Sequence, residues 1–360
     1  RRWAAPCAVA ATVGAVLAIP ATGLAGVPAV QDDQMTIAAP IDQVQKRVNM
    51  VKATNTKVAR FDILWSYVAP TKPANPRNPN DPAYDWTRAD IVLNGFAKAK
   101  ITPIVSVYST PDWAVQGRNV PVQTQYNPNA PVAKAYADFM QAVATRYKGK
   151  ARHFEVWNEP NLKGFFSHNG RSNLARYKGL VKAAYPAIKR GNKRAIVIAG
   201  VAGPNNSGKN GNVGARAWLT GLVGDKSVKF DAYSQHIYPS QGPRFQSRSY
   251  ARAYPTWNSL DYIYKQLDRK KKGMKLYVTE AGYTTAISGK WPLGEFDPAY
   301  LAMARGFEHQ CGHYFGALDY FTHVRDGELD WYRNQVPSKE EGYATHLIAQ
   351  EACRIIAAQE

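Results

Sequence analysis

Short apolar runs alternate with longer amphipathic runs along most of the chain, and this alternation constrains the fold more than any other feature. The short runs are typical of buried strands and occupy residues 27–31, 56–64, 101–109, 153–158, 195–202, 230–238, 275–280 and 314–323. The longer runs have a helical period and occupy residues 41–53, 86–100, 132–147, 172–190, 215–223, 256–271, 298–310 and 342–357. Strands that alternate with helices form parallel sheets. Eight such units in 360 residues predict an α/β protein with a single (β/α)8 TIM barrel, whose active site would lie at the C-terminal strand ends.

The alternative fold for this pattern is a doubly wound open sheet. Such a sheet would carry a glycine-rich loop after its first strand, and none follows residues 27–31. The stretch 203–210 nearly spells a phosphate-binding loop, but Asn210 stands where that loop needs Ser or Thr for magnesium. We therefore interpret it as an ordinary loop after the fifth strand.

The first residues have the pattern of a targeting segment. Arg1 and Arg2 precede an apolar run from Ala4 to Pro20, and small residues follow. This order is typical of a secretory signal peptide, and the run is too short for a membrane span. We expect a signal peptide at residues 1–25, the barrel at residues 26–360, and a protein that is secreted or held in the cell envelope. The Arg pair leaves Sec and twin-arginine export both open.

Two cysteines, Cys311 and Cys353, fall in the predicted mature chain. In an exported protein they could form a disulfide, and two separate buried thiols are the alternative.

The chain is basic, with a formal net charge of +19. Lys and Arg clusters at residues 189–194 and 269–275 fall where predicted helices end, and cations there interact favourably with the helix dipole. We interpret most of the charge as a solvated face, and no nucleic-acid-binding motif accompanies it. Arg244, Arg248 and Arg252 instead follow a strand end, which favours an anionic substrate.

Two predicted strands end in a glutamate. The fourth leads into Trp-Asn-Glu-Pro at residues 157–160, where the proline cannot continue a strand ladder, and the seventh leads into Thr-Glu-Ala-Gly at residues 279–282. In a barrel these strand ends share one mouth, so Glu159 and Glu280 should face each other. Two carboxyl groups about 5–5.5 Å apart can break a glycosidic bond, one as nucleophile and one as acid/base. Ordinary surface ion pairs are the alternative.

These motifs resemble those of clan A of the glycoside hydrolases. Residues 154–161 are most similar to family 39 and to family 5-like bacterial barrels, including endoglycosidases tied to exopolysaccharide biosynthesis. The likeness runs from about Val27 to the C-terminus and includes residues 60–62, 110–114 and 330–332. The resemblance implies a retaining glycoside hydrolase that acts on a poly- or oligosaccharide and needs no cofactor.

The resemblance also implies roles for single residues. Glu159 would be the general acid/base and Glu280 the nucleophile, and Asn158 would bind the 2-hydroxyl of the sugar. In the resembling families a His or Tyr at the end of the sixth strand contacts the nucleophile or the sugar, which points to His236 and Tyr238. A histidine and a tyrosine that simply line the barrel are the alternative.

Further candidates come from the strand pattern. Arg60 on the second strand could keep Glu280 ionised by proximity or contact the substrate. Glu155 points to the same side as Glu159, one layer deeper, and a buried carboxylate needs a partner such as Arg60 or His153.

Three tryptophans near strand ends, Trp65, Trp113 and Trp331, are candidate platforms on which a sugar ring stacks, with loop packing as the alternative for each. The seven histidines show no close paired spacing suited to zinc, so we expect no metal. Two other functions stay open: a transglycosylase, in which a sugar hydroxyl replaces water, and a catalytically silent carbohydrate-binding barrel.

Overall fold

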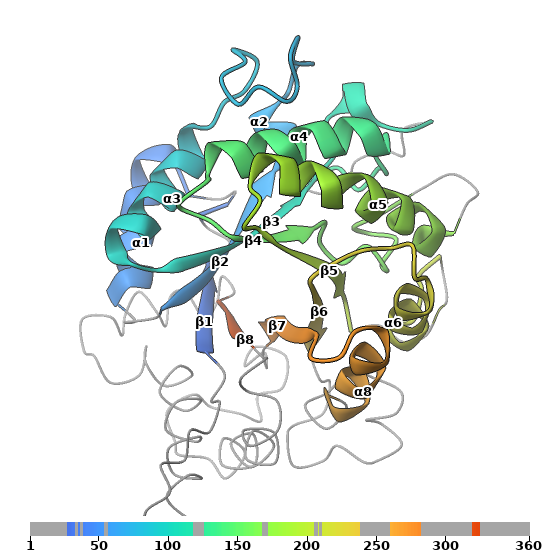
Figure 1. Ribbon diagram of the computed structural model, residues 1–360. Helices are drawn as coiled ribbons and strands as arrows, with labels where there is room; N and C mark the ends of the chain where they lie inside the picture. The colour runs from blue at the N-terminus through green and yellow to red at the C-terminus, as the bar shows by residue number, and fades with distance from the viewer. Residues whose placement is uncertain are drawn as a thin grey trace, which may run out of the picture.

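The computed structural model describes residues 27–32, 35–36, 39–53, 57–117, 126–167, 172–204, 208, 211–237, 260–281 and 319–324. Within these residues, parallel strands pair in chain order and the last pairs with the first, so the sheet closes into a barrel (Figure 1). The strands are β1 (Val27–Asp32), β2 (Val58–Leu64), β3 (Thr102–Tyr108), β4 (His153–Val156), β5 (Ile196–Ala202), β6 (Ala232–Ile237), β7 (Lys275–Ala281) and β8 (Asp319–Val324). The predicted (β/α)8 barrel is confirmed.

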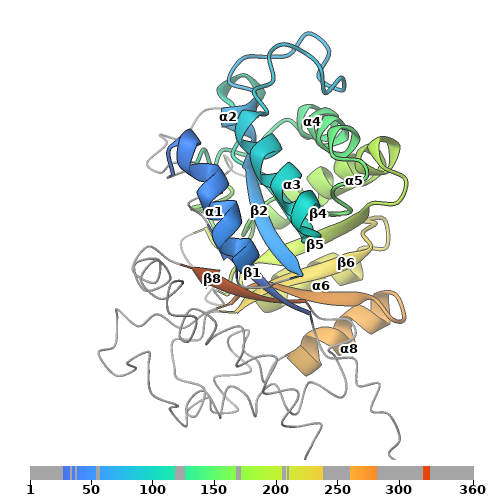
Figure 2. The same cartoon turned by 90° about the vertical axis from the view of Figure 1, so that its left-hand side faces the viewer.

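The helices lie outside the strands (Figure 2). They are α1 (Ile41–Ala53), α2 (Trp65–Val68), α3 (Thr87–Ala99), α4 (Ala133–Arg146), α5 (Asn173–Gly191), α6 (Ala215–Gly224) and α8 (Leu260–Lys270), with a 3-10 turn, η2 (Asp112–Ala114), after β3. α4 packs along α5, α1 against α3, and α6 against α8. The short α2 and η2 were not predicted, and the helices predicted at 298–310 and 342–357 lie outside the described residues. No helix in the described part of the chain is long and apolar enough to cross a membrane.

Alternation along β2 divides the core in two. Ala59, Phe61 and Ile63 belong to the main apolar cluster between strands and helices. Val58 instead joins a second cluster inside the barrel, to which six strands contribute one residue each: Ala29, Val58, Ile104, Ile198, Ala232 and Tyr277. The barrel therefore has an apolar floor.

A polar layer lies directly above this floor. Residues two positions further along these strands face the same side, and they include five buried polar side chains: Gln31, Arg60, Ser106, Ser234 and Thr279. Glu155 on β4, which pairs in register with Ser106, is buried at the same level. Charged groups in such a place need partners. The strand pattern thus sets charged and polar side chains between the apolar floor and the open mouth.

Candidate active site

β4 ends at Val156, two residues earlier than predicted, because the chain turns sharply there. Trp157 and Glu159 have φ angles of 73° and 41°, in the left-handed region that non-glycine residues rarely adopt. The buried Trp157 holds this turn: its indole N–H donates to the carbonyl of Phe165 at 2.7 Å, and its backbone N–H donates to the hydroxyl of Tyr136 at 3.1 Å. Strained backbone persists where surroundings fix it, and here it aims Glu159 into the mouth.

Glu280 reaches the mouth through a register shift in β7. Ser234 pairs with Tyr277, whereas His236 pairs with Glu280, so β7 has one extra residue between these two points. Tyr277 belongs to the apolar floor and Thr279 contacts the hydroxyl of Ser234, so regular alternation would turn Glu280 outward. The extra residue turns Glu280 inward, to the same side as Tyr277 and Thr279. A β-bulge near an active site often redirects a side chain in this way.

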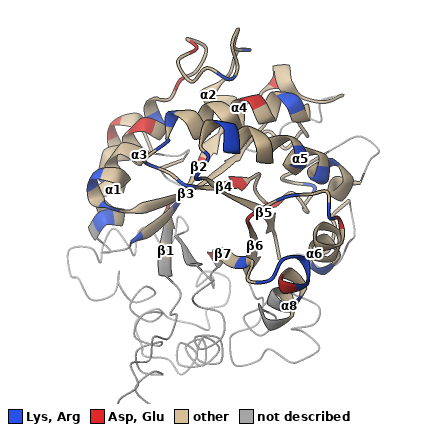
Figure 3. Ribbon diagram, in the orientation of Figure 1, with Lys and Arg blue, Asp and Glu red and all other residues tan. Residues whose placement is uncertain are grey.

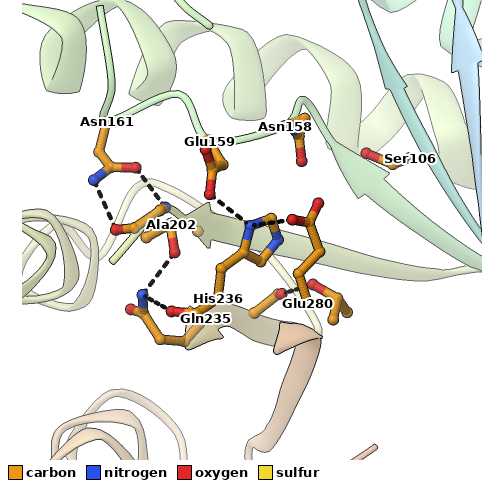
Figure 4. A network of polar contacts seen from close by, with 12 residues as sticks. Ser106, Asn158, Glu159, Asn161, Ala202, Gln235, His236 and Glu280 are labelled. Carbon is orange, nitrogen blue, oxygen red and sulfur yellow. Dashed lines mark hydrogen bonds and ion pairs between the residues drawn. The ribbon is translucent and has the colours of Figure 1, made fainter. Parts of the chain in front are cut away.

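His236 on β6 lies between the two carboxylates (Figure 4). Its Nδ1 is 2.9 Å from Oε1 of Glu159 and 3.4 Å from Oε2 of Glu280. A carboxylate oxygen of Glu159 and one of Glu280 lie within 4.8 Å of each other. Two glutamates more than a hundred residues apart in the sequence thus face each other at one end of the barrel, as the strand count predicts.

The charge state of His236 follows from these neighbours. Burial alone would lower the pKa of its imidazole, but the carboxylates of Glu280 and Glu159 outweigh burial and raise that pKa above its ordinary value. The protonated ring can donate a hydrogen bond from Nδ1 to Glu159.

Arg60 on β2 has a fully buried guanidinium beneath the mouth. It donates hydrogen bonds to, or pairs with, Glu280 Oε1 (2.6 Å), Glu155 Oε2 (2.7 Å), Gln31 Oε1 (2.7 Å), Asn158 Oδ1 (2.8 Å) and Asp62 Oδ1 (3.2 Å). Burial opposes its charge, but the surrounding carboxylates outweigh burial and hold the pKa of Arg60 well above its ordinary value. The partner of Glu155 is therefore Arg60 and not His153.

Because Arg60 is covered, it acts through Glu280 and Asn158 and not by touching a sugar, which corrects its predicted substrate contact.

The three residues at the mouth could also be considered as metal ligands. Glu159, His236 and Glu280 each offer one atom, and these atoms lie within 4.8 Å of one another, a donor set that divalent metals accept. However, Arg60 already donates to Glu280 at 2.6 Å, and its positive charge opposes a second cation at this distance. The arrangement therefore fits acid–base and nucleophilic chemistry better than metal binding.

A model of the glycosyl hydrolases family 39 matches residues 61–317, a segment that includes both glutamates. The chain belongs to this family. One similar solved structure is a GH39 beta-xylosidase from Caulobacter crescentus, with 16% identity and a TM-score of 0.55 over 82% of this chain and 62% of that one. A GH39 enzyme from Xanthomonas axonopodis pv. citri has 17% identity and a TM-score of 0.57 over 82% of this chain and 58% of that one. A glucosidase from Croceicoccus marinus has 14% identity and a TM-score of 0.57 over 86% of this chain and 62% of that one. Their likeness confirms the barrel fold. The chain spans about three fifths of the length of these proteins.

In this family 39 chain, Asn158 is oriented by Arg60. Its Oδ1 accepts a hydrogen bond from Arg60 Nη2, so its Nδ2 remains as the donor beside Glu159. This orientation suits the predicted bond to a sugar hydroxyl, which stays a prediction.

Gly203, after β5, is a site residue that was not among the predicted ones. A Cβ at this position would lie 2.9 Å from the carboxyl carbon of Glu159 and 2.7 Å from Cδ1 of Leu162. Asn161 holds the loop in place, since its Oδ1 accepts from the N–H of Gly203 at 2.7 Å and its Nδ2 donates to the carbonyl at 3.0 Å (Figure 4). A glycine directly after a strand signals a close approach of backbone to another group, and this was the available clue.

The prediction that Trp65 is a sugar platform is wrong. Its ring is fully buried and stacks on Phe139 with centroids 5.2 Å apart, because α2 begins directly after β2 and turns the indole into the main core, where its burial stabilises the fold. Trp113 is half-buried, packs its edge against Trp65 and donates its indole N–H to the carbonyl of Ala69 at 2.8 Å. Loop packing thus accounts for its position, and its contact with a sugar stays a prediction.

Other aromatic residues stand at the same end of the barrel. Tyr126 and Phe165, on the loops after β3 and β4, are half-buried and stacked with centroids 4.9 Å apart. Tyr108 packs edge-on against Tyr126 and donates its hydroxyl to Asp62 at 3.1 Å. Tyr126 and Phe165 were not predicted because their loops carry no regular period.

Several predicted residues lie outside the described part of the chain: Tyr238, Trp331, Cys311, Cys353, Arg244, Arg248 and Arg252, together with the signal peptide at residues 1–25. The roles assigned to them stay predictions.

Proposed function

We propose that this chain is a retaining glycoside hydrolase that cleaves O-glycosidic bonds of a poly- or oligosaccharide, with Glu280 as nucleophile and Glu159 as general acid/base. The observation that carries the proposal is that one carboxylate oxygen of Glu159 and one of Glu280 lie within 4.8 Å of each other. Retaining enzymes need a separation of about 5–5.5 Å, whereas inverting enzymes need about 6.5–9.5 Å to admit a water molecule.

In the first step Glu159 is a carboxylic acid and Glu280 a carboxylate. Glu159 donates its proton to the glycosidic oxygen while Glu280 attacks the anomeric carbon from the opposite side. The bond to the leaving group breaks and a glycosyl ester of Glu280 forms. Arg60 binds Oε1 of Glu280, so we assign the attack to Oε2, which lies 3.4 Å from Nδ1 of His236. The guanidinium of Arg60 favours the ionised form of this nucleophile.

In the second step Glu159 has lost its proton and acts as a base. It removes a proton from water, the oxygen attacks the anomeric carbon, and the ester bond to Glu280 breaks. Two displacements restore the original anomeric configuration. His236 contacts both carboxylates, and we assign it a positioning role in which its Nδ1–H holds Glu159 toward the substrate.

Aromatic residues at the same end of the barrel as the two carboxylates support a carbohydrate substrate. Tyr126 and Phe165 offer partly exposed rings on which the apolar face of a sugar can pack. An anionic sugar is the further expectation from the basic composition and from Arg244, Arg248 and Arg252. Export through the predicted signal peptide is also part of the proposal, and the N-terminal sequence of the mature protein tests it.

The proposed function is tested with a panel of aryl glycosides and polysaccharides, with the anomeric configuration of the first product followed by proton NMR. We expect hydrolysis with retained configuration. Inverted product would reject the mechanism. Binding of glycans without any product would instead support the catalytically silent barrel.

A further inference from the structure

A cavity of about 720 Å³ lies at the end of the barrel opposite the two carboxylates. Its lining includes Phe230 and Asp231, directly before β6, and Met274, directly before β7. β7 runs from Lys275 to Glu280 and beyond, and five residues of strand span roughly 16 Å. The cavity is therefore separate from the catalytic mouth.

Exposed cations gather around this cavity. Figure 3 shows Lys and Arg on the segments around α6 and α8, and the lining includes Lys226, Lys229, Arg269 and Lys271. None of these four forms an ion pair within the described part of the chain, whereas Asp231, the carboxylate in the lining, is paired with Lys189 at 2.7 Å. The rim thus carries a net positive charge.

One further cation, Lys270, has a structural role. Its Nζ donates to the carbonyl of Leu222, in the last turn of α6, and to that of Asp225, directly after this helix, each at 2.9 Å. Burial, followed by repulsion from Lys178, lowers the pKa of Lys270 despite the attraction of Asp225. A bound anion would offset part of this cost.

The helix dipole accounts for only some of the cations that line the cavity. Arg269 lies in the last turn of α8, where a cation is favourable. Lys271 directly follows α8, where its backbone N–H still donates to the carbonyl of Leu267, so the dipole favours this cation as well. Lys226 and Lys229 lie on the loop between α6 and β6, and the dipole effect falls off beyond the last turn of a helix. Like charges grouped on loops repel one another, which a negatively charged ligand would relieve.

The floor of the cavity is apolar. Val228, Phe230 and Met274 are buried and Tyr185 is half-buried, and the volume lies within the range of about 300–1,000 Å³ that is usual for small-ligand sites. A ligand that fits must combine an apolar face with negative charge at its edge. Sugar rings that bear carboxylates have this combination.

We propose that this cavity is a second, non-catalytic binding site for an anionic polysaccharide whose sugar rings carry carboxylates. The choice of a glycan over another polyanion rests on the proposed function. Such a site would hold the polymer to the enzyme while the mouth at the other end acts on it.

The test measures binding of a short oligouronate to the full chain by titration calorimetry, with a neutral oligosaccharide of the same length as comparison. The variant Lys229→Glu/Lys271→Glu reverses two charges in the lining. The matched control Lys98→Glu/Lys148→Glu reverses two exposed lysines at the same end of the barrel, before β3 and β4. We expect the cavity variant to weaken oligouronate binding at least about tenfold and the control to change it less than about twofold, because local charge governs the attraction.

Hydrolysis of a small aryl glycoside by both variants should equal that of the parent chain, which separates this test from that of the proposed function. Equal oligouronate binding by the two variants would overturn the proposal. A single-stranded oligonucleotide that binds as tightly, with the same dependence on Lys229 and Lys271, would overturn it in favour of a nucleic-acid site. If the protein hydrolyses no glycoside but binds the oligouronate in a way that depends on Lys229 and Lys271, the cavity proposal is supported and the proposed catalytic function is rejected.

Discussion

Arg60 and Glu280 are joined across the barrel by a 2.6 Å contact between Nη1 and Oε1, although 220 positions separate them in the sequence. The contact links β2 to β7. The same guanidinium donates to Glu155 and Asn158, so one buried side chain connects the predicted nucleophile to the residue that precedes the predicted acid/base.

Replacing Arg60 with Met should strongly destabilise the fold. The change leaves Glu155 as a buried carboxylate without its cation, and breaking such a pair costs about 3–5 kcal/mol. Urea unfolding measures the loss, and the double variant Arg60→Met/Glu155→Met should recover part of it because the orphaned charge is also removed. A loss below about 1 kcal/mol, the value of an exposed ion pair, would contradict the central position given to Arg60.

Replacing Gly203 with Ala should impair catalysis more than stability. The new methyl group would lie 2.9 Å from the carboxyl carbon of Glu159, so this carboxyl must shift, and a displacement of about 1 Å can cost up to about 100-fold in rate. The measurement is kcat/KM on an aryl glycoside. Gly164→Ala is the matched control on the neighbouring loop, since a Cβ there meets nothing within 4 Å. Equal activity of the two variants would show that Glu159 has room to move.

His236 should make stability depend on pH in one direction. Its pKa is raised in the folded state because the Glu280 and Glu159 carboxylates outweigh burial. Its contribution is therefore complete below the ordinary value of about 6.5 and is lost as pH rises through the folded pKa. The difference in unfolding free energy between the parent and His236→Asn should be largest near about pH 6 and shrink above it. A difference that stays constant up to about pH 9 would contradict this charge assignment.

His153 should act in the opposite direction. Burial, together with the nearby charges of Arg152 and Lys275, lowers its pKa to about 4. The unfolded chain binds this proton from about pH 6.5 downward and the folded chain does not, so stability is lost as pH falls from about 6.5 to about 4. His153→Gln should lose less stability over this window in urea titrations at each pH. Equal slopes for parent and variant would exclude His153 as a contributor to acid unfolding.

The order of strands and helices could be predicted from the sequence because it depends on local patterns. Alternation and run length mark β2, β3 and β5 within about two residues, and the strand count is enough to bring Glu159 and Glu280 to one end of the barrel. The partnership of Arg60 with the carboxylates also follows from inward-facing positions on adjacent layers.

The details of the site could not be predicted because contacts distant in sequence decide them. The early end of β4 depends on hydrogen bonds of Trp157 to Tyr136 and Phe165. The inward position of Glu280 depends on a register shift against β6 that no local pattern reveals. Trp65 was misassigned because burial against Phe139, and not its place at a strand end, determines where its ring lies.

The central claim is the division of roles between the two glutamates, and azide rescue with product stereochemistry tests it most directly. Glu280→Ala and Glu159→Ala are each assayed on an aryl glycoside with and without sodium azide. We predict that azide restores part of the activity of Glu280→Ala and gives a glycosyl azide of inverted configuration, whereas Glu159→Ala gives a glycosyl azide of retained configuration through the Glu280 ester. A retained product from Glu280→Ala, or an inverted product from Glu159→Ala, would contradict the assignment of Glu280 as the nucleophile.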